Sequence, residues 1–594
     1  MRRHSRIKTV VATPINQRAV WFLVCVYITF GAIVARLFFW QIIKHQELEA
    51  VAQAQYQRTV LQTGKRGDVF FANGDPLITN IESYRLFAQP HLIADENKLA
   101  LAEKLAKILI KLEPEESTDS LNNLEAELLK KLTKPKVKWI SLYQPVDTET
   151  KAAIEAIGEK NLGFDSYYQR FYPEASMAAH LTGFVGKNSQ GDDVGYFGLE
   201  GNLQHELQPR SVTDHIVADA TGVSIEQDQL NAHYLDGRNV TTSIERNIQY
   251  TIEKQLKAGL EKYGAEAGEI IVTQPQTGKI LALAATPNFD PNDFYQYDSQ
   301  SYINPALSSL YEPGSTFKIL TVATGIDAGV LTPDTVCTKC AGPRQFGQFT
   351  LKTWNEEYHP NITMTEALAK SDNVAMIFAA ELIGSTTFRD YLQKFGIGKS
   401  IGLDLQGDVN TPFPDSWVPV ELATASFGQG IVTTSLQLVQ AVGAIANRGQ
   451  LMQLQILNSV YDPTTQTEIK VEPKTLTQVV KPETARQVTE MMVNAAVHGE
   501  AQWTYHPDHS VAGKTGTSQV ANESGYDSSK TIASFIGFAP ADDPQFLMFV
   551  KLVAPQTSPW AAETAAPLWY ATADDLYLLL NIPPDKSPEV PKND

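Results

Sequence analysis

Hydrophobic residues form one long run close to the start of the chain. From Ala19 to Ala35 the sequence AVWFLVCVYITFGAIVA carries no charge, and after Arg36 it continues as LFFWQII. A run of this length can cross a bilayer as a helix. The flank before it contains no acidic residue but five basic ones, Arg2, Arg3, Arg6, Lys8 and Arg18. By the positive-inside rule we expect a cytoplasmic tail over residues 1–18, an anchor over 19–43 and export of the remainder.

A cleaved signal peptide is the competing interpretation of this run. The run is long for a signal peptide, and no small-x-small cleavage site follows it. No later segment approaches membrane-spanning length without charges. The sequence therefore predicts a single-pass protein of the cytoplasmic (inner) membrane, with its N-terminus inside.

The pattern changes to short alternating and amphipathic segments over residues 44–235. KRGDVFFANGDPLITN places Asn73-Gly74 between apolar runs, as expected of a hairpin turn. The spacing of Leu, Ala, Lys and Glu from Glu96 to Lys134 predicts amphipathic helices, and WISLYQPV with FDSYYQRFYP adds strands. Because no metalloprotease, Walker or dinucleotide motif occurs here, we interpret the region as a spacer or docking domain.

A second domain is predicted over residues 236–580, followed by a polar tail over 581–594. VTTSIERNIQYTIEKQLKAGLEKYG is typical of a short strand and an amphipathic helix, and EIIVTQPQTGKILALAATP of a hairpin that turns at Gly278. Strands and helices in both domains indicate an α+β protein. A chain of 594 residues is also too long for a single core.

Composition excludes one class of function and leaves one cysteine pair open. The formal net charge of −18 argues against nucleic-acid binding, which needs a basic surface. Cys337 and Cys340 form a lone CxxC that fits a zinc half-site, a redox pair or a local disulfide. Since no second cysteine pair lies nearby, a disulfide or two free thiols is favoured over zinc, and no metal site is expected.

Candidate chemistry begins with a serine and a lysine spaced by one helical turn. In YEPGSTFKILTVATGIDAGV, Pro313 and Gly314 precede a helical run, so Ser315 should lie at a helix N-terminus with Lys318 on the same face. A partly desolvated lysine can take the proton of a serine hydroxyl and make it a nucleophile. Alone, the pattern is more typical of a helix cap followed by a solvated lysine.

Two further motifs follow in the same domain. Ser371-Asp372-Asn373 lies between the helical runs TMTEALAK and VAMIFAAELI and predicts a tight corner, although a simple helix cap would look the same. Lys514-Thr515-Gly516-Thr517 lies in a predicted strand of SVAGKTGTSQVA. Gly516 has no side chain, so a substrate backbone could approach that strand edge.

The combination of SxxK, SxN and KTG in this order resembles the penicillin-recognising serine enzymes. The resemblance covers nearly the whole chain and is closest to the class B penicillin-binding proteins, the monofunctional peptidoglycan D,D-transpeptidases. RGDVFFANGDPL, RFYPEASMAAHLTGFVG and GYFGLEGNLQHEL are similar to their pedestal segments, and YEPGSTFK with ATASFGQGIVTTSLQLVQAVGAIANRG is more similar to the septal than to the elongation branch. Pro305, where the family usually has arginine, and the CxxC pair depart from the pattern.

The resemblance implies a fold and a role for each motif residue. The catalytic domain is expected to be an antiparallel sheet covered by helices, similar to serine β-lactamases. Lys318 would accept the proton of Ser315. Ser371 would relay a proton to the leaving amine, and Lys514 would hold the Ser371 hydroxyl. The expected substrate-binding residues are Asn373, Thr515, Gly516 and Thr517, with the backbone N–H groups of Ser315 and Thr517 as the oxyanion hole.

The resemblance also implies partners. The substrates would be peptidoglycan stem peptides, and β-lactams, which resemble their D-alanyl-D-alanine terminus, would acylate the same serine. A membrane glycosyltransferase would polymerise the glycan, and cell-division proteins would be further partners. No metal or organic cofactor is required.

Other functions remain as alternatives. An elongation-type transpeptidase shares every motif. A β-lactamase would need a placed base for rapid deacylation, and no Glu-x-x-x-Asn element follows Ser371 closely. A bifunctional synthase would need a glycosyltransferase signature that the N-terminal half lacks. A β-lactam sensor or a divisome scaffold with secondary catalysis belongs to a different class, but a sensor would need more than the short segment before the anchor.

Overall fold

The computed structural model describes residues 16–49, 57–113, 117–217, 232–414, 416–522 and 525–585. These residues belong to two compact units. The first comprises residues 1–64 and 210–235, and the second comprises residues 65–209 and 236–594. Each unit is described by itself below.

The first unit contains the apolar helix. Helix α1 (Gln17–Phe38) continues into a π-helical turn, Phe39–Ile43, and the Asn16 side chain caps its start by accepting a bond from the backbone N–H of Arg18 (3.2 Å). Within the described ranges this is the one helix long and apolar enough to cross a membrane. The unit also holds an antiparallel pair, β1 (Gln57–Thr63) with β8 (Ser211–Val217). The predicted single anchor therefore forms a continuous helix.

The second unit contains a seven-stranded sheet built from distant parts of the sequence. Its short strand β2 pairs in parallel with β9, so Val69 and Phe70 lie beside Val240 and Thr241. The strand order is β16-β15-β9-β2-β3-β4, and β5 pairs with β3. The strands are β2 (Val69–Phe70), β3 (Pro76–Ala88), β4 (Ile140–Val146), β5 (Leu162–Phe171), β9 (Asn239–Thr242), β15 (Leu457–Asp462) and β16 (Thr467–Lys470).

The same unit contains a five-stranded antiparallel sheet in the order β11-β10-β20-β19-β18. Adjacent residues in its strands enter different cores: Ile270 packs on one face and Ile271 on the other, as the period of two in a strand requires. The strands are β10 (Ala267–Gln274), β11 (Lys279–Thr286), β18 (Ala512–Asn522), β19 (Gly525–Ala539) and β20 (Phe546–Val553).

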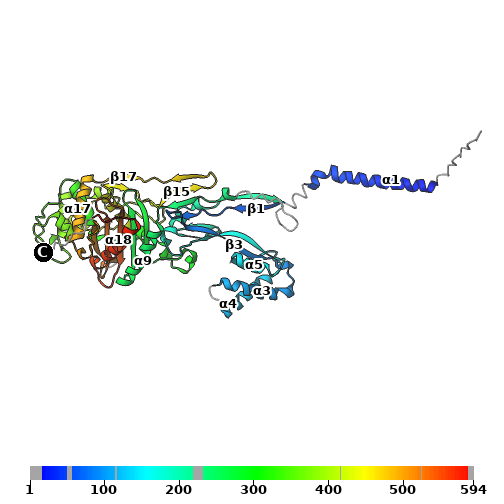
Figure 1. Ribbon diagram of the computed structural model, residues 1–594, viewed down its shortest axis with the longest axis horizontal. Coiled ribbons are helices and arrows are strands. Elements are labelled where there is room, and N and C mark those ends of the chain that lie inside the picture. The colour runs from blue at the N-terminus through cyan, green and yellow to red at the C-terminus, as the bar shows by residue number, and fades with distance from the viewer. Residues whose placement is uncertain are drawn as a thin grey trace, which may run out of the picture. The chain divides into compact units, whose positions relative to one another are not determined.

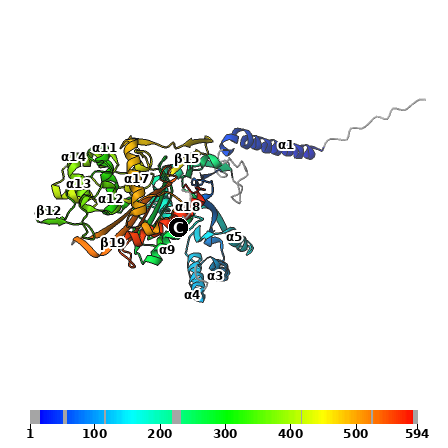
Figure 2. The same ribbon diagram turned by 60° about the vertical axis from the view of Figure 1, so that its left-hand side comes forward.

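Helices cover both faces of this five-stranded sheet. On one face α9 and α18 pack through a core that includes Trp569, and on the other a larger set of helices surrounds α11 (Figures 1 and 2). The expected antiparallel sheet covered by helices is confirmed. The helices are α9 (Arg246–Tyr263), α10 (Pro305–Ser308), α11 (Lys318–Asp327), α12 (Met364–Ala369), α13 (Asn373–Ile383), α14 (Ser385–Lys394), α15 (Pro419–Ala425), α16 (Ser435–Ala446), α17 (Pro482–His498) and α18 (Ala565–Leu579).

A third core lies where three helices pack on β3, β4 and β5 (Figure 1). Leu105 and Leu128 are buried there, which confirms the amphipathic helices predicted between residues 96 and 134, and Ile154 of the next helix joins the same core. The helices are α3 (Asp95–Leu109), α4 (Thr118–Leu132) and α5 (Thr148–Glu155). Shorter elements of the unit are α6 (Ala179–Thr182), β6 (Phe184–Lys187), β7 (Asp193–Tyr196), α7 (Gly198–Asn202), α8 (Gln204–Leu207), β12 (Arg344–Phe346), β13 (Phe349–Leu351), β14 (Gln450–Met452) and β17 (Thr475–Gln478).

Both predicted hairpin turns form. Gly74, with φ +89°, lies between β2 and β3, and Gly278, with φ +73°, lies between β10 and β11. A Cβ atom at Gly278 would also come within 2.2 Å of the Gln453 carbonyl oxygen. Glycine is therefore needed at position 278 for both the positive φ and the close approach.

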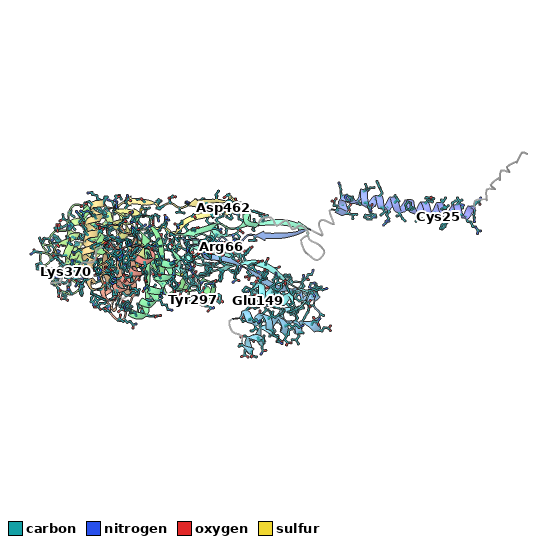
Figure 3. All side chains as sticks on the ribbon, in the orientation of Figure 1. Cys25, Arg66, Glu149, Tyr297, Lys370 and Asp462 are labelled. Atoms are coloured by element: carbon teal, nitrogen blue, oxygen red, sulfur yellow. A yellow bond between two sulfur atoms is a disulfide. The ribbon has the colours of Figure 1, made fainter. Side chains whose placement is uncertain are left out.

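A buried ion triad joins three segments of the second unit: Arg66 before β2, Arg170 on β5 and Glu200 in α7. The Glu200 carboxylate, which has no exposed surface, accepts bonds from Arg66 Nε and Arg170 Nε, each at 2.6 Å. Arg66 also donates to the Glu200 carbonyl oxygen at 3.1 Å (Figure 3 labels Arg66). Removing one member of such a group leaves uncompensated charge in the interior.

We predict that Glu200→Gln destabilises the protein by about 3 to 5 kcal/mol, because two buried guanidinium groups lose their counter-charge. Urea unfolding of the full chain in detergent, followed by tryptophan fluorescence, measures the effect. Glu490→Gln is the matched control, since Glu490 forms an exposed pair with Arg486 and should leave the urea midpoint nearly unchanged. Equal midpoints for the two variants would contradict a structural role of the triad.

Candidate active site

The predicted nucleophile lies in a tight turn that leads into a buried helix. Ser315 belongs to a 3₁₀ turn, Gly314–Phe317, and Lys318 is the first residue of α11, so the serine precedes the α-helix rather than opening it. Ser315 is half-buried. Within the described ranges its hydroxyl makes no hydrogen bond to another protein group, so it is available to a substrate.

Lys318 is fully buried and donates to the SxN segment. Its Nζ lies 2.5 Å from the Ser371 carbonyl oxygen, 2.7 Å from Asn373 Oδ1 and 3.3 Å from Ser371 Oγ. Burial, followed by the nearby charge of Lys514, lowers the pKa of Lys318 to about 7, against smaller opposing effects of Glu500 and Asp372. A lysine with such a pKa loses its proton readily near neutral pH.

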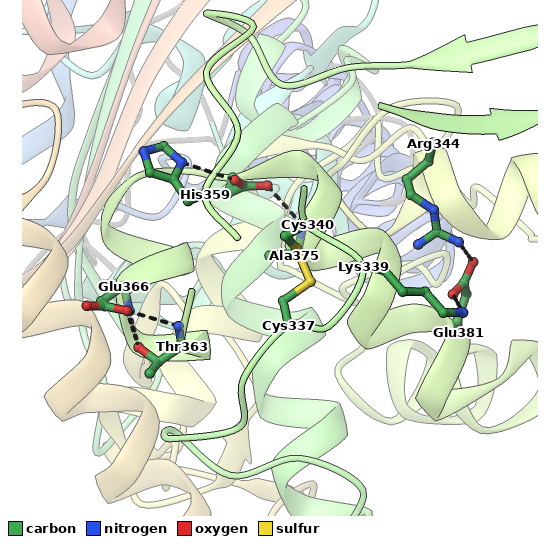
Figure 4. The surroundings of a disulfide bond; sticks show 10 residues. Cys337, Lys339, Cys340, Arg344, His359, Thr363, Glu366, Ala375 and Glu381 are labelled. Atoms are coloured by element: carbon green, nitrogen blue, oxygen red, sulfur yellow. Dashed lines mark hydrogen bonds and ion pairs between the residues drawn. A yellow bond between two sulfur atoms is a disulfide. The ribbon is translucent and has the colours of Figure 1, made fainter. Parts of the chain in front are cut away.

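The SxN segment forms the predicted corner between α12 and α13. Ser371 is buried and has φ +54°, in the left-handed region that non-glycine residues seldom adopt. Asp372 caps α13, because its carboxylate accepts the backbone N–H of Ala375 at 2.9 Å. His359 Nδ1 lies 3.6 Å from the same carboxylate, as Figure 4 shows. The Asp372 cap therefore fixes the start of α13 directly after Ser371.

The open question of the CxxC pair is answered by a disulfide between Cys337 and Cys340, both buried (Figure 4). The backbone N–H of Cys337 donates to the Ile362 carbonyl oxygen at 2.9 Å. One residue further, Thr363 begins α12 through a capping box with Glu366. The disulfide segment thus packs against the start of the helix that leads to Ser371.

The KTG motif lies on β18, the last strand of the five-stranded sheet. Lys514 is buried and its Nζ donates to Thr515 Oγ1 at 3.0 Å, while Thr515 Oγ1 donates to Glu500 Oε2 at 2.7 Å. Burial lowers the pKa of Lys514, and the Glu500 carboxylate opposes that change. Thr517 Oγ1 accepts the backbone N–H of Ala561 at 3.1 Å, which leaves its own proton free to donate.

Close backbone approaches bring the serine turn against β18 and against a glycine loop. A Cβ at Gly516 would lie 2.8 Å from Thr316 Cγ2 and 3.0 Å from the Pro313 carbonyl oxygen. Gly428, with φ +78°, accepts the Gly314 backbone N–H at 3.1 Å, and its Cβ would lie 2.2 Å from the Gly314 carbonyl oxygen. Side chains at these positions would displace the turn that carries Ser315.

Two exposed tryptophans contact each other, one from a segment that is bonded to the SxN motif and one from a segment that is bonded to the KTG strand. Trp354 and Trp560 have ring centroids 5.0 Å apart. Two residues before Trp354, the Lys352 carbonyl oxygen accepts a bond from Asn373 Nδ2 at 3.2 Å. Ala561, next to Trp560, contacts Thr517 as described above. The indole pair therefore lies at the rim of the candidate site.

The predicted residues fall into one site, and several of its members were not predicted. Lys318, Ser371 and Asn373 are joined through the buried ammonium. Ser315 lies in the turn just before Lys318, and Gly516 lies against that turn. Glu500, Gly428 and the two tryptophans lack a local sequence signal. Gly428 could have been suspected from the GQG repeat of glycine at 428–430, but its contact with Gly314 depends on the fold.

Comparisons with known proteins identify similarity to penicillin-binding proteins over most of the chain. A model described as the penicillin binding protein transpeptidase domain matches residues 268–574, and one described as the penicillin-binding protein dimerisation domain matches residues 61–242. Penicillin-binding protein PbpB of Mycolicibacterium smegmatis is 30% identical over 592 residues, covering 93% of this chain and 89% of the relative. Peptidoglycan D,D-transpeptidase FtsI of Escherichia coli is 26% identical over 579 residues, covering 96% and 93%.

A solved structure supports the same fold. Penicillin binding protein 2X from Streptococcus thermophilus superposes with a TM-score of 0.71 at 21% identity, covering 88% of this chain and 80% of that chain.

We predict that Gly428→Ala slows covalent labelling by a fluorescent penicillin by about 100-fold or more, because the added methyl group displaces the turn that positions Ser315. The labelling rate constant of the full chain in detergent measures this. Gly443→Ala is the matched control: Gly443 lies inside α16 with no atom near its would-be Cβ, so its rate should equal that of the unmodified chain. A normal rate in Gly428→Ala would refute the packing argument.

Proposed function

The chain belongs to the class B penicillin-binding proteins, peptidoglycan D,D-transpeptidases that bind penicillin, and from this we propose that Ser315 is the nucleophile that forms the acyl-enzyme. The observation that carries the proposal is the buried Lys318 ammonium, which is bonded to two members of the SxN motif. A serine needs a neighbouring base. Lys318, one helical turn from Ser315, is that base.

The contacts of Lys318 suit a group that cycles between two protonation states. When charged, it can donate to all three acceptors on Ser371 and Asn373. When neutral, its two N–H groups can keep the shorter bonds, to the Ser371 carbonyl at 2.5 Å and Asn373 Oδ1 at 2.7 Å. Its lone pair is then free to take the Ser315 proton. The Ser315 oxygen attacks the carbonyl of the penultimate D-alanine as that proton leaves.

Ser371 and Lys514 complete the proton path in this proposal. The Ser371 hydroxyl, 3.3 Å from Lys318 Nζ, passes a proton to the departing D-alanine nitrogen as the peptide bond breaks. Lys514 adds positive potential. An amine of a neighbouring stem peptide then attacks the ester. Lys318 takes the amine proton and passes it to the Ser315 oxygen as the ester bond breaks, so that the Ser315 hydroxyl is restored, Lys318 is neutral again and the new cross-link retains the acyl group.

In this proposal, β18 and Asn373 bind the substrate. Because β18 ends its sheet, its outer edge can receive an extended stem peptide, and glycine at 516 keeps that approach open. The backbone N–H groups of Ser315 and Thr517 stabilise the oxyanion, an effect of about 2.7 to 4 kcal/mol for one donor. Asn373 binds the donor amide, and Thr517 binds the terminal carboxylate. Thr515 was expected to share that role, but its hydroxyl donates its one proton to Glu500.

The same reasoning extends to organisation in the cell. We assign residues 1–18 to the cytoplasm, 19–43 to the membrane, 44–235 to the pedestal and 236–580 to the transpeptidase domain, with a tail over 581–594. The catalytic domain then lies outside the cytoplasmic membrane, where stem peptides are. We propose that a membrane glycosyltransferase supplies the nascent glycan. The similarity to the septal branch supports a role at the division septum, together with cell-division proteins.

We predict that penicillin adds a single long-lived mass to the full chain and none to Ser315→Ala. Intact-mass spectrometry after incubation of the detergent-solubilised proteins measures the adduct. A retained adduct in Ser315→Ala would exclude Ser315 as the nucleophile. Rapid loss of the adduct with drug hydrolysis would favour a β-lactamase, and the absence of any adduct on the folded wild-type chain would favour a scaffold.

We predict that the acylation rate constant rises between about pH 6 and about pH 8, because only neutral Lys318 acts as the base. The apparent pKa of this rise should lie close to the value of about 7 for Lys318. Stopped-flow acylation by a chromogenic cephalosporin across this range measures the profile. A rate that is flat through neutral pH would contradict the assignment of Lys318.

A further inference from the structure

Glu500 lies beside the KTG strand but belongs to none of the three motifs. It follows α17 by two residues, after Gly499. A Cβ at Gly499 would lie 2.2 Å from the Ala495 carbonyl oxygen and 2.9 Å from that of Ala369, at the end of α12. The chain therefore leaves α17 in close contact with α12, and this path delivers the Glu500 carboxylate to β18.

A directed hydrogen-bond chain links Glu500 to a buried lysine. The Thr515 hydroxyl has one proton, which it donates to Glu500 Oε2 at 2.7 Å. Its lone pairs can therefore face Lys514, whose Nζ donates to Thr515 Oγ1 at 3.0 Å. Without the carboxylate, the hydroxyl would be free to turn its proton toward a substrate. Glu500 thus sets the orientation of a donor in the candidate site.

Charged groups reach Lys318 from several elements. Lys514 comes from β18, Glu500 from the segment after α17, and Asp372 from the cap of α13, with His359 next to Asp372. Lys514 lowers the pKa of Lys318, whereas Glu500 and Asp372 raise it. Glu500 also raises the pKa of Lys514. Of these anions, Glu500 is the one that acts on both lysines.

We propose that Glu500 is a positioning residue for acyl transfer: its carboxylate orients the Thr515 hydroxyl and keeps Lys514 charged while Lys318 is neutral. This inference rests on the proposed function. The reaction needs opposite protonation states of two neighbouring buried lysines. An anion that is hydrogen-bonded to the Lys514 side of the pair, through Thr515, favours this arrangement.

The proposal fixes the direction of the pH effect. Loss of the Glu500 charge removes a favourable interaction of both ammonium groups, so both pKa values fall. As the pH rises, the acylation rate increases when Lys318 loses its proton, which is the rising limb of the profile. At higher pH the rate decreases when Lys514 loses its proton, which is the falling limb. Both limbs of the pH profile should therefore move to lower pH in Glu500→Gln, each by at least about half a pH unit. A residue with only a structural role would lower the rate without moving the limbs.

The experiment measures acylation of the full chain in detergent by a fluorescent penicillin between about pH 5 and about pH 10. Glu500→Gln keeps an acceptor for Thr515 but removes the charge. Glu500→Asp keeps the charge and should retain the wild-type limbs. Glu500→Ala removes both and should shift the limbs and also lower the maximum rate. Glu490→Gln, on the exposed face of α17, controls for the change in net charge and should match the wild type.

Shifted limbs in both the Gln and the Ala variants, with unshifted limbs in Asp and in Glu490→Gln, are the expected result. Unshifted limbs in Glu500→Gln overturn the proposal even if its rate falls. Should Glu500→Gln fail to fold, unshifted limbs in Glu500→Ala overturn it equally. A wild-type chain that penicillin does not label at any pH is a different result, because it removes the proposed function on which the inference rests.

Discussion

The candidate active site depends on the burial of two lysines within reach of each other's charge. Lys318 has no exposed surface and Lys514 is 3% exposed. A buried ammonium is strongly unfavourable unless polar groups compensate it. The short hydrogen bonds of Lys318 go to a carbonyl oxygen and an amide oxygen rather than to a carboxylate. These oxygens stabilise the ammonium charge, but no bonded counter-charge holds the lysine in its protonated form. This incomplete compensation allows the lysine to exchange its proton near neutral pH.

Close packing of backbone on backbone places these lysines. Gly428 contacts Gly314, and Gly516 faces Pro313 and Thr316, so the serine turn is held between a loop and the edge strand β18. Each approach is shorter than a side chain would permit. Ser315 is therefore positioned by segments that converge from residues 314, 428 and 516, and the hydrogen bonds of Lys318 connect this turn to the corner at Ser371.

Sequence patterns predicted the local features well because local features have local causes. The turns at Gly74 and Gly278, the apolar helix and the three motifs follow from neighbouring residues. The seven-stranded sheet was beyond such patterns, since it pairs β2 with β9 across most of the N-terminal half. Glu500 was also missed. A single glutamate after a helix carries no signal until the fold brings it within hydrogen-bond distance of Thr515.

Ser371 shows why a strained backbone is retained at this site. A positive φ in a non-glycine residue costs about 1 kcal/mol or more, and glycine would avoid that strain. Glycine, however, would lack the hydroxyl that lies 3.3 Å from Lys318 Nζ. In the left-handed conformation, the carbonyl and hydroxyl of one residue both face the same ammonium, and the next residue, Asp372, can begin α13 as its cap. An extended conformation at Ser371 would turn one of these groups away, so the strain and the convergence on Lys318 have a common origin.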